Sequence, residues 1–383
     1  MNYNLNDEQK LIRKSVRDFA ETAIKPKAKD LDEKGEFSEE LTQAMGELGL
    51  FGMSLPIKYG GQAMSTLSYI IAVEELARVD SSQAATLAAH NSLGIGPLYY
   101  FGNAKQKEKY LHKLTTGKHL WSFGLTEPNA GSDSRGTKTK ATLKNGEWTI
   151  NGSKIFITNG ASILNAGSTV QSVTKTSDGK KKFMAIIIEA GTKGFKRVPM
   201  HDKMMWRASD TSELYFDDCR VPEENLLGEI GQGSKIMLST LDNGRLSIAA
   251  MGLGLAQGAF EEAVKYSKTR KQFGKFISKF QAISFRIADM GTKIELGRNL
   301  LYKACRMKDA GQDFGKEAAM AKLYCSEMAK EVADDAVQVH GGYGLMKDYP
   351  VERFYRDQRL LQIGEGTSEI QRLVIAREIL SQF

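Results

Sequence analysis

Cysteine and histidine are scarce in this chain of 383 residues, and their positions argue against two common kinds of structural site. The three cysteines, Cys219, Cys305 and Cys325, are far apart and odd in number, so they do not predict a disulfide framework. The five histidines make no metal-ligand spacing with these cysteines or with each other. We therefore expect neither a structural nor a catalytic zinc, and we name no metal ligand.

Long apolar runs are also missing. No stretch approaches the ~18 residues needed to span a bilayer. The N-terminal segment lacks a basic start followed by an apolar core, and it carries Asp7 and Glu8 early, so it predicts neither a secretory signal nor a transit peptide. We therefore expect a cytoplasmic protein that makes no membrane contact.

The composition that remains is typical of a globular protein. Hydrophobic residues make up 41% of the chain, enough to bury a large core, and charged residues make up 26%. The net charge of +7 is interpreted as a solvated basic surface rather than a nucleic-acid patch, so we expect no nucleic-acid partner. The length suggests two or three domains.

The hydrophobic period divides the chain into three parts. Residues 1–118 have a helical period, residues 119–226 alternate apolar and polar side chains, and residues 227–383 return to the helical period. Asn145-Gly146 and Asn151-Gly152 predict two hairpin turns in the middle part. We therefore expect an α+β multidomain protein with an N-terminal helical domain, a small middle antiparallel β-barrel or sandwich, and a C-terminal four-helix bundle.

Two glycine-containing stretches need separate interpretation. GLGLAQG (252–258) is similar to a dinucleotide-binding fingerprint, but it lies inside a helical pattern and no strand precedes it. We interpret its glycines as allowing two helices to approach closely. FGLTEPNAGSDSRG (123–136) lies between the helical and strand regions, where free backbone N–H groups and small hydroxyls can hold a phosphate.

The second stretch is the first of several segments that resemble the acyl-CoA dehydrogenase family. The others follow in the family's order: KIFITNG (154–160), LDNGR (241–245), RKQFGKFISKFQAI (270–283), QVHGGYGLMKDYPVERFYRD (338–357) and IGEGTSEIQR (363–372). The resemblance implies FAD as the cofactor and an α–β–α fold. It also implies removal of two hydrogens from the α and β carbons of an acyl-CoA thioester, giving the trans-2-enoyl-CoA.

The resemblance also implies which residues bind FAD. Thr126 and Thr158 would hydrogen-bond the flavin, and Phe156 stands where the family usually has tryptophan. The same subunit would further contribute Phe123, Leu125, Gly131, Ser132, Ile157, Thr367 and Glu369. A neighbouring subunit would complete the site with Arg270, Phe273, Gln281, Gln338, Gly341 and Gly342.

Glu365 is the predicted catalytic base. The α-hydrogen of a thioester is weakly acidic, so the reaction needs a base and stabilisation of the developing enolate. Gly364 and Gly366 flank Glu365 and leave the thioester room beside its side chain. We expect burial to raise the pKa of the carboxyl towards neutrality. A family variant carries its base at the position of Gly244, which cannot act as one.

The resemblance assigns the acyl-CoA substrate to Ser132, Asp242, Arg245 and Gly366. Ala84, in the helix expected after VDS (79–81), stands where a glutaryl-CoA branch has an arginine, so a dicarboxylic substrate is not expected. Gly364 replaces a tyrosine common in short- and medium-chain members, which predicts a wider pocket. Met205 and Trp206 depart from the family pattern.

The expected electron acceptor is an electron-transferring flavoprotein, and the expected assembly is a homotetramer built as a dimer of dimers. Two other functions stay open. An acyl-CoA oxidase would use oxygen, but such enzymes usually carry a further C-terminal domain. A DNA-associated relative would have little dehydrogenase activity, but such relatives carry a basic C-terminal extension. Acyl length, branching and pathway do not follow from the sequence.

Overall fold

The computed structural model describes residues 4–175 and 179–381. Its first part is helical. The helices are α1 (Asp7–Phe19), α2 (Lys25–Lys34), α3 (Glu39–Glu47), α4 (Thr66–Ala77), α5 (Ser81–Ala88), α6 (Ile95–Phe101) and α7 (Ala104–Leu114). A π-helical turn, η1 (Ala20–Ile24), joins α1 to α2, and another, η3 (Ala89–Gly94), joins α5 to α6.

Polar side chains fix where several of these helices begin. The Asn6 side chain accepts from the backbone N–H of Gln9 and completes a capping box at α1. The Ser38 hydroxyl accepts from the backbone N–H of Leu41 and caps the start of α3. The buried faces of α4 and α5 then form part of the main apolar core.

The middle part is a β-sheet. Its strands are β1 (Leu120–Gly124), β2 (Lys140–Lys144), β3 (Glu147–Thr158), β4 (Asn165–Lys175), β5 (Lys181–Glu189), β6 (Phe195–Pro199), β7 (Thr211–Pro222) and β8 (Leu226–Leu227). Neighbouring strands follow the order β6-β7-β3-β2-β4-β5-β8, and β1 pairs with β4. Most pairs are antiparallel as predicted, but β1 and β2 each pair with β4 in parallel, so the sheet is mixed.

One of the two predicted hairpin turns is wrong. Asn145-Gly146 joins β2 to β3 as expected, with both residues at positive φ. Asn151-Gly152 instead lies inside β3, where the register against β7 shifts between Ile150 and Gly152. A Cβ at Gly152 would lie 2.7 Å from Thr139 Cα, so this glycine serves a close approach within the sheet rather than a turn.

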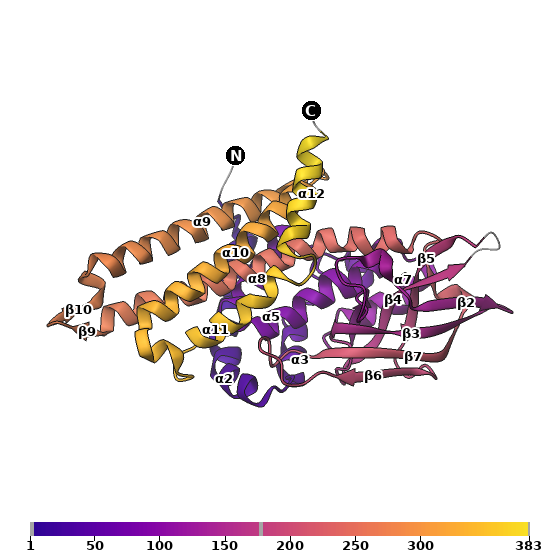
Figure 1. Cartoon of the computed structure of the whole chain (residues 1–383), viewed down its shortest axis with the longest axis horizontal. Coiled ribbons are helices and arrows are strands. Elements are labelled where there is room, and N and C mark those ends of the chain that lie inside the picture. The colour runs from indigo at the N-terminus through magenta and orange to yellow at the C-terminus, as the bar shows by residue number, and fades with distance from the viewer. Residues whose placement is uncertain (1–3, 176–178, 382–383) are drawn as a thin grey trace.

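The last part is a helical bundle. It comprises α8 (Gly233–Thr269), the short hairpin β9 (Lys271–Gln272) and β10 (Lys275–Phe276), α9 (Gln281–Asp309), α10 (Gly315–His340), α11 (Val351–Asp357) and α12 (Ser368–Leu380). In Figure 1 the sheet lies at one end of the molecule and the β9–β10 hairpin at the other, with the N-terminal helices beside α8 and α10.

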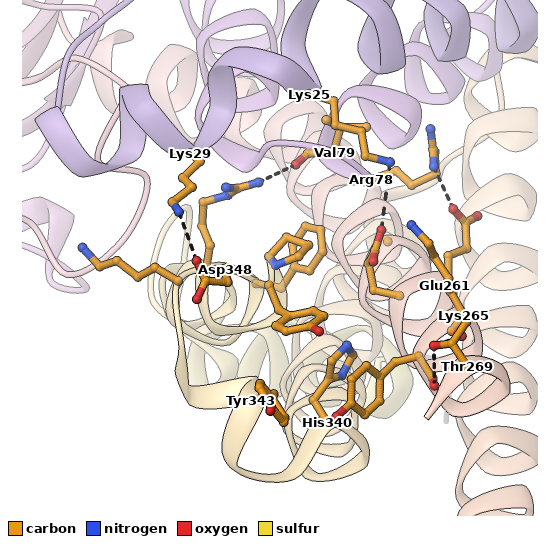
Figure 2. Close-up of a pocket in the computed structure, with 18 of the residues that line it drawn as sticks. Lys25, Lys29, Arg78, Val79, Glu261, Lys265, Thr269, His340, Tyr343 and Asp348 are labelled. Carbon is orange, nitrogen blue, oxygen red and sulfur yellow. Dashed lines mark hydrogen bonds and ion pairs between the residues drawn. The ribbon is translucent and has the colours of Figure 1, made fainter. Parts of the chain in front are cut away.

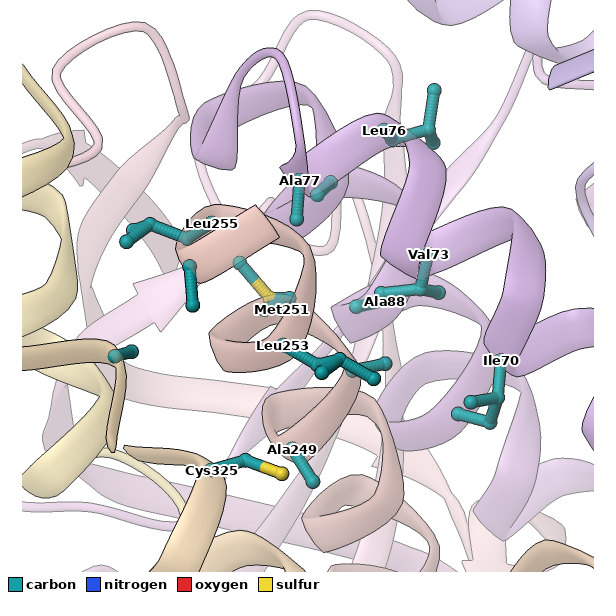
Figure 3. Packing of buried hydrophobic residues seen from close by; sticks show 14 of the residues in the cluster. Ile70, Val73, Leu76, Ala77, Ala88, Ala249, Met251, Leu253, Leu255 and Cys325 are labelled. Atoms are coloured by element: carbon teal, nitrogen blue, oxygen red, sulfur yellow. The ribbon is translucent and has the colours of Figure 1, made fainter. Parts of the chain in front are cut away.

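Helix α8 packs against both α4 and α10, and its glycines make this possible. A Cβ at Gly254 would lie 2.1 Å from the Glu74 carbonyl oxygen, and one at Gly252 would lie 2.7 Å from the Cys325 carbonyl oxygen. This confirms that the stretch 252–258 mediates helix packing. Figure 3 shows Met251, Leu253 and Leu255 of α8 within the resulting apolar core.

None of the helices within residues 4–175 and 179–381 combines the length and apolar character needed to cross a membrane.

Candidate active site

Glu365 lies in the loop between η8 (Gln358–Gln362) and α12. Its φ is +53°, in the left-handed region that non-glycine residues rarely adopt, and the φ of Gly366 is +93°. The Gln371 side chain donates to the carbonyl oxygens of Glu365 and Gly366 at 3.3 and 3.0 Å. The Thr367 hydroxyl caps α12 by accepting from the backbone N–H of Ile370. The loop is therefore held in an otherwise unfavourable conformation.

The Glu365 side chain lies directly over Gly244 of α8. A Cβ at Gly244 would lie only 1.7 Å from Glu365 Oε2 and 3.2 Å from Leu93 Cδ2. The carboxyl therefore occupies the space where any side chain at position 244 would begin. The predicted base, Glu365, and Gly244, where the resemblance places the base of a family variant, therefore meet at one place in this fold.

The environment of the carboxyl suits a general base. As a residue Glu365 is half-buried, but its Oε2 atom is shut off from solvent and has no hydrogen-bond partner among the described residues. Burial raises the pKa of Glu365 to about 7, against the opposing effect of the Lys322 and Arg245 charges. A carboxyl with this pKa is divided between its two protonation states near neutral pH, as proton transfer requires.

Arg245 and Asp242 lie one helical turn apart on α8 and form an ion pair. Arg245 is 8% exposed and its charge acts on Glu365, so the pair lies inside the site rather than on an open helix surface. Burial lowers the pKa of Arg245 and raises that of Asp242.

The first group of predicted FAD residues comes together at one edge of the sheet. The backbone N–H of Ile155 donates to the Thr126 carbonyl oxygen at 2.9 Å, which places the segment after β1 beside Phe156 and Thr158 of β3. Phe123 is buried, whereas Leu125, Thr126 and Thr158 are half-buried.

β3 is irregular at Phe156 and Ile157, and the irregularity determines which of these two neighbouring side chains faces the core. The register against β7 shifts between Lys154 and Ile157, and Phe156 has a φ of +61°. Phe156 is 62% exposed, as a stacking surface for a flavin requires. The Ile157 side chain is 3% exposed and packs in the apolar core of the sheet. The contact between Ile157 and the cofactor stays a prediction, and the side chain of Ile157 is turned into the core.

A buried ion pair that we did not predict supports this edge. Lys154 is fully buried, and its ammonium donates to Glu127 Oε1 at 2.7 Å and to the Leu125 carbonyl oxygen at 3.0 Å. Glu127 also accepts from the backbone N–H groups of Lys138 and Thr139. Gly131 and Ser132 follow in an exposed loop, and a Cβ at Gly131 would meet no atom within 4 Å.

The second group of predicted FAD residues lies at the other end of the molecule. Arg270, Phe273, Gln338, Gly341 and Gly342 line a cavity of about 700 Å³ beside the β9–β10 hairpin. Gln281 begins α9 at its edge and does not line it.

The features of this cavity fit an aromatic and anionic ligand group. Phe273 is 93% exposed with a φ of +50°, and Arg270 forms no ion pair in the described part of the chain. A Cβ at Gly341 or Gly342 would meet no atom within 4 Å, so the backbone there is open to close approach. Within one chain, however, these predicted FAD residues at the hairpin lie far from the predicted FAD residues at the sheet edge.

A further cavity, of about 630 Å³, separates α2 from the C-terminal ends of α8 and α10 (Figure 2). Ion pairs cross it, including Arg78 with Glu261 at 2.7 Å and Lys29 with Asp348 at 3.6 Å. Because these pairs join the N-terminal helices to the bundle, we interpret it as a charged junction rather than the reaction centre.

Thr367 and Glu369 lie at the start of α12, beside the Glu365 loop. Glu369 is exposed, whereas the Thr367 hydroxyl is engaged in capping the helix. No group of histidine, cysteine and acidic residues in the described ranges has the arrangement of a metal site.

Comparisons with known proteins identify the class of protein to which this site belongs. The family descriptions "Acyl-CoA dehydrogenase, N-terminal domain", "middle domain" and "C-terminal domain" match residues 6–118, 122–219 and 231–380. The chain is 49% identical over 380 residues to a probable acyl-CoA dehydrogenase of Bacillus subtilis, covering 99% of this chain and 100% of the relative. The chain therefore belongs to the acyl-CoA dehydrogenase family.

Solved structures agree. Butyryl-CoA dehydrogenase from Megasphaera elsdenii is 46% identical with a TM-score of 0.96, covering 99% of this chain and 100% of that chain. A chain from a structure described as the electron transferring flavoprotein of Acidaminococcus fermentans has the same values. Acyl-CoA dehydrogenase complexed with FAD from Bacillus anthracis is 34% identical with a TM-score of 0.94, covering 100% and 68%. The predicted fold class, enzyme class and FAD cofactor are confirmed.

Proposed function

We propose that Glu365 is the base of an FAD-dependent dehydrogenation of acyl-CoA thioesters. The observation that carries this proposal is the position of its carboxyl over Gly244, where Oε2 is buried without a partner and its pKa is raised to about 7. In this position the carboxylate can take the α-proton of a thioester in the adjacent pocket. When bound, FAD supplies the acceptor for the hydride that leaves the β carbon.

The backbone of the same loop can stabilise the charge that develops on the thioester oxygen. Among the described residues, the Glu365 N–H donates to no backbone or side-chain acceptor. A free N–H beside the base is the kind of donor that stabilises an oxyanion. We assign to Arg245 and Asp242 the orientation of the CoA chain near this point, and to Ser132 a contact with the CoA chain or the cofactor's pyrophosphate.

Two subunits would share each cofactor. Within one chain the flavin-binding residues at the sheet and the predicted phosphate- and adenosine-binding residues at the β9–β10 hairpin lie at opposite ends. Both surfaces are exposed, and the second one has the exposed Phe273 and Arg270, which forms no ion pair with the described residues and lies over the Tyr343 ring. In an assembly where the hairpin of one chain reaches the sheet edge of another, the two groups of FAD residues would form one site and both exposed surfaces would be covered. We propose that this assembly is a dimer of dimers.

The electrons pass to an electron-transferring flavoprotein. Relatives named for short-chain acyl-CoA dehydrogenase and butyryl-CoA dehydrogenase, and the similarity to a chain in an electron-transferring flavoprotein structure, agree with this partner. The likeness to butyryl-CoA dehydrogenase makes short acyl-CoA thioesters the first substrates to test. Whether the acyl group is straight, branched or cyclic depends on the pocket beside Gly364.

The function is tested by anaerobic titration of the FAD-loaded enzyme with butyryl-CoA and with longer, branched and cyclic acyl-CoAs. We expect bleaching of the flavin absorbance by at least one class, and fast re-oxidation by an electron-transferring flavoprotein. Stoichiometric peroxide formation at the full turnover rate would instead establish an oxidase. Failure of every thioester to bleach the flavin would contradict the proposed reaction.

Two assignments accompany this function. We propose domain boundaries near residues 118 and 226, where helical and strand structure meet. We also propose a cytoplasmic location, because the three cysteines are free and buried, as in a reducing compartment. Detection of the protein in an oxidising compartment would contradict the second assignment.

A further inference from the structure

Lys322 is a charged side chain buried in the middle of α10. It is 0% exposed, and its ammonium donates to the Gly366 carbonyl oxygen at 2.6 Å. An ammonium has three donors, and this is its one hydrogen bond to the described residues. Because isolating a charge from water is costly, a lysine in this position requires either neutralisation or a compensating charge.

The bond that Lys322 makes falls on the loop that carries Glu365. The Gly366 carbonyl oxygen accepts from Lys322 on α10 and from Gln371 on α12, so two helices hold one peptide group. That peptide group joins Gly366 to Thr367, one residue beyond Glu365, whose left-handed backbone is unfavourable for a residue with a side chain. Holding it from two sides fixes the direction in which the Glu365 side chain leaves the loop.

The charges of Lys322 and Glu365 also act on each other. Burial lowers the pKa of Lys322 to about 8, and Glu365 is the largest effect in the opposite direction. Burial raises the pKa of Glu365 to about 7, and Lys322 is again the largest opposing effect. The two groups form no ion pair, so the attraction acts across a gap and leaves the carboxylate oxygens available to a substrate.

We propose that Lys322 is a positioning residue for the Glu365 base: it anchors the Gly366 carbonyl and supplies the positive charge that keeps the buried carboxylate ionised. This inference rests on the proposed role of Glu365. It predicts that removing the charge makes Glu365 harder to ionise, whereas removing the anchor alone disorders the loop without that change.

Other charged groups face this pair and define the controls. Arg245 of α8 faces Glu365 together with its partner Asp242, and Tyr69 of α4 lies close enough to feel the carboxylate. Glu369 and Glu327 face Lys322. All of these remain in the variants below, so a change in titration reports the charge at position 322.

The experiment compares five variants with the wild-type holoenzyme and uses a sixth, Glu365→Gln, to assign the carboxyl signal. Lys322→Met removes both the charge and the donor, Lys322→Gln removes the charge but keeps an amide donor, and Lys322→Arg keeps the charge. Gln371→Met removes the second donor to the Gly366 carbonyl and leaves Lys322 intact. Lys330→Met, on an exposed turn of α10, is the matched control.

Two readouts follow the Glu365 carboxyl. One is the pH dependence of the anaerobic flavin-reduction rate in a single turnover. The other is infrared titration of the protonated-carboxyl band without substrate, assigned by its loss in Glu365→Gln. The second readout does not depend on catalysis and separates electrostatics from a general loss of structure.

We expect both neutral variants to raise the carboxyl pKa by about one unit, which lowers the ionised fraction at pH 7 about fivefold. Activity should then recover at higher pH. Lys322→Arg and Lys330→Met should titrate like the wild type, and Gln371→Met should slow reduction without moving the pKa.

The results that overturn the inference are equally distinct. A wild-type carboxyl pKa in Lys322→Gln would overturn it even if Lys322→Met did not fold. A shift in Lys322→Arg equal to that in Lys322→Gln would show that charge is not the cause. Normal reduction by Glu365→Gln would instead contradict the proposed function itself.

Discussion

At the residue scale, two glycines around Glu365 have different functions. Gly244 has no side chain, which leaves room for the Glu365 carboxyl; a Cβ at position 244 would collide with Oε2. Gly364 has no such constraint: its φ is not positive, and a Cβ there would meet only Leu360, at 3.5 Å or more. The backbone at position 364 therefore accepts a side chain. The three atoms nearest to such a Cβ all belong to Leu360, and none belongs to Met205 or Trp206.

Gly364→Tyr tests whether the pocket beside Gly364 selects the substrate. Filling apolar space favours a ligand by roughly 0.8 kcal/mol per buried CH₂, so two or three groups change preference about tenfold to a hundredfold. We expect the variant to lose kcat/KM for branched or cyclic acyl-CoAs by such a factor and to lose much less for butyryl-CoA.

Gly364→Ala is the matched control for this substitution, because its Cβ makes only ordinary contacts. It should retain the wild-type preference. Equal losses in Gly364→Tyr across straight, branched and cyclic substrates would show that the space near Gly364 does not determine specificity.

At the element scale, the β9–β10 hairpin and the strand β3 present the predicted cofactor residues on separate exposed surfaces. Phe273 on the hairpin and Phe156 on β3 are both large, exposed and at positive φ. Strained and exposed aromatic residues are unfavourable in an isolated chain, and they indicate surfaces that become covered in the functional assembly.

Arg270→Ala tests whether the hairpin completes a cofactor site on another subunit. Because a ligand bound across an interface stabilises the assembly, the variant should lose FAD and dissociate together. We expect at least a tenfold weaker FAD affinity by flavin fluorescence and a shift to smaller species in sedimentation at micromolar protein.

Lys268→Ala, an exposed change in the last turn of α8, should alter neither property. A fully flavinated monomer of Arg270→Ala, or of the wild type, would contradict a shared site.

The elements were predictable to different degrees, for physical reasons. Long helices such as α8, α9 and α10 have a periodic apolar face, so their approximate extents follow from the sequence. The register shifts inside β3 do not follow from it, because Asn151-Gly152 is equally typical of a hairpin turn. The register shift between Lys154 and Ile157 also changes which face of β3 the following side chains lie on, so that Ile157 lies in the core and Phe156 is exposed.

Buried charges are the other feature that the sequence did not reveal. Lys154 and Lys322 look like ordinary surface lysines in a strand and a helix, yet both are fully buried beneath the site. Their partners, Glu127 and the Gly366 carbonyl, are distant in the chain or are backbone groups, so no local pattern predicts the contacts. The motif around Glu365 was predictable because its residues are consecutive.

At the scale of the whole molecule, a buried carboxyl connects the middle part of the chain to the C-terminal part. Asp357 of α11 is fully buried, and its Oδ1 accepts from the Trp206 backbone N–H at 2.8 Å. The Trp206 indole N–H donates to the Asp357 carbonyl oxygen at 3.1 Å. Burial, together with the charge of the nearby Asp80, raises the pKa of Asp357 to about 7. This contact joins the loop after β6 to the helical bundle.

A raised carboxyl pKa sets the direction of a pH effect on stability. The contribution of Asp357 is fully present below its unfolded pKa of about 4 and is lost as pH rises through about 7. Asp357→Asn keeps an oxygen acceptor for the Trp206 N–H but cannot ionise. Its free energy of unfolding should exceed that of the wild type at pH 8 by about 1 kcal/mol or more, and the difference should shrink at pH 5.

Denaturant unfolding at the two pH values measures this difference, with the exposed Asp289→Asn as the control. A lower stability of Asp357→Asn at pH 8 would show that the ionised carboxylate, rather than its neutral form, stabilises the junction.

The central claim is that Glu365 is the base, and the most direct measurement is anaerobic stopped-flow reduction of flavin in Glu365→Gln. Glutamine has nearly the same shape as glutamate and fits over Gly244, but its amide cannot accept the α-proton of the thioester. We predict wild-type FAD content, unchanged binding of a substrate analogue and a reduction rate lower by about 10²–10⁴-fold at every pH. Glu108→Gln, at an exposed position of α7, is expected to keep a rate within tenfold of the wild type. A Glu365→Gln enzyme that is fully flavinated and reduces its flavin at a near-normal rate would contradict the account.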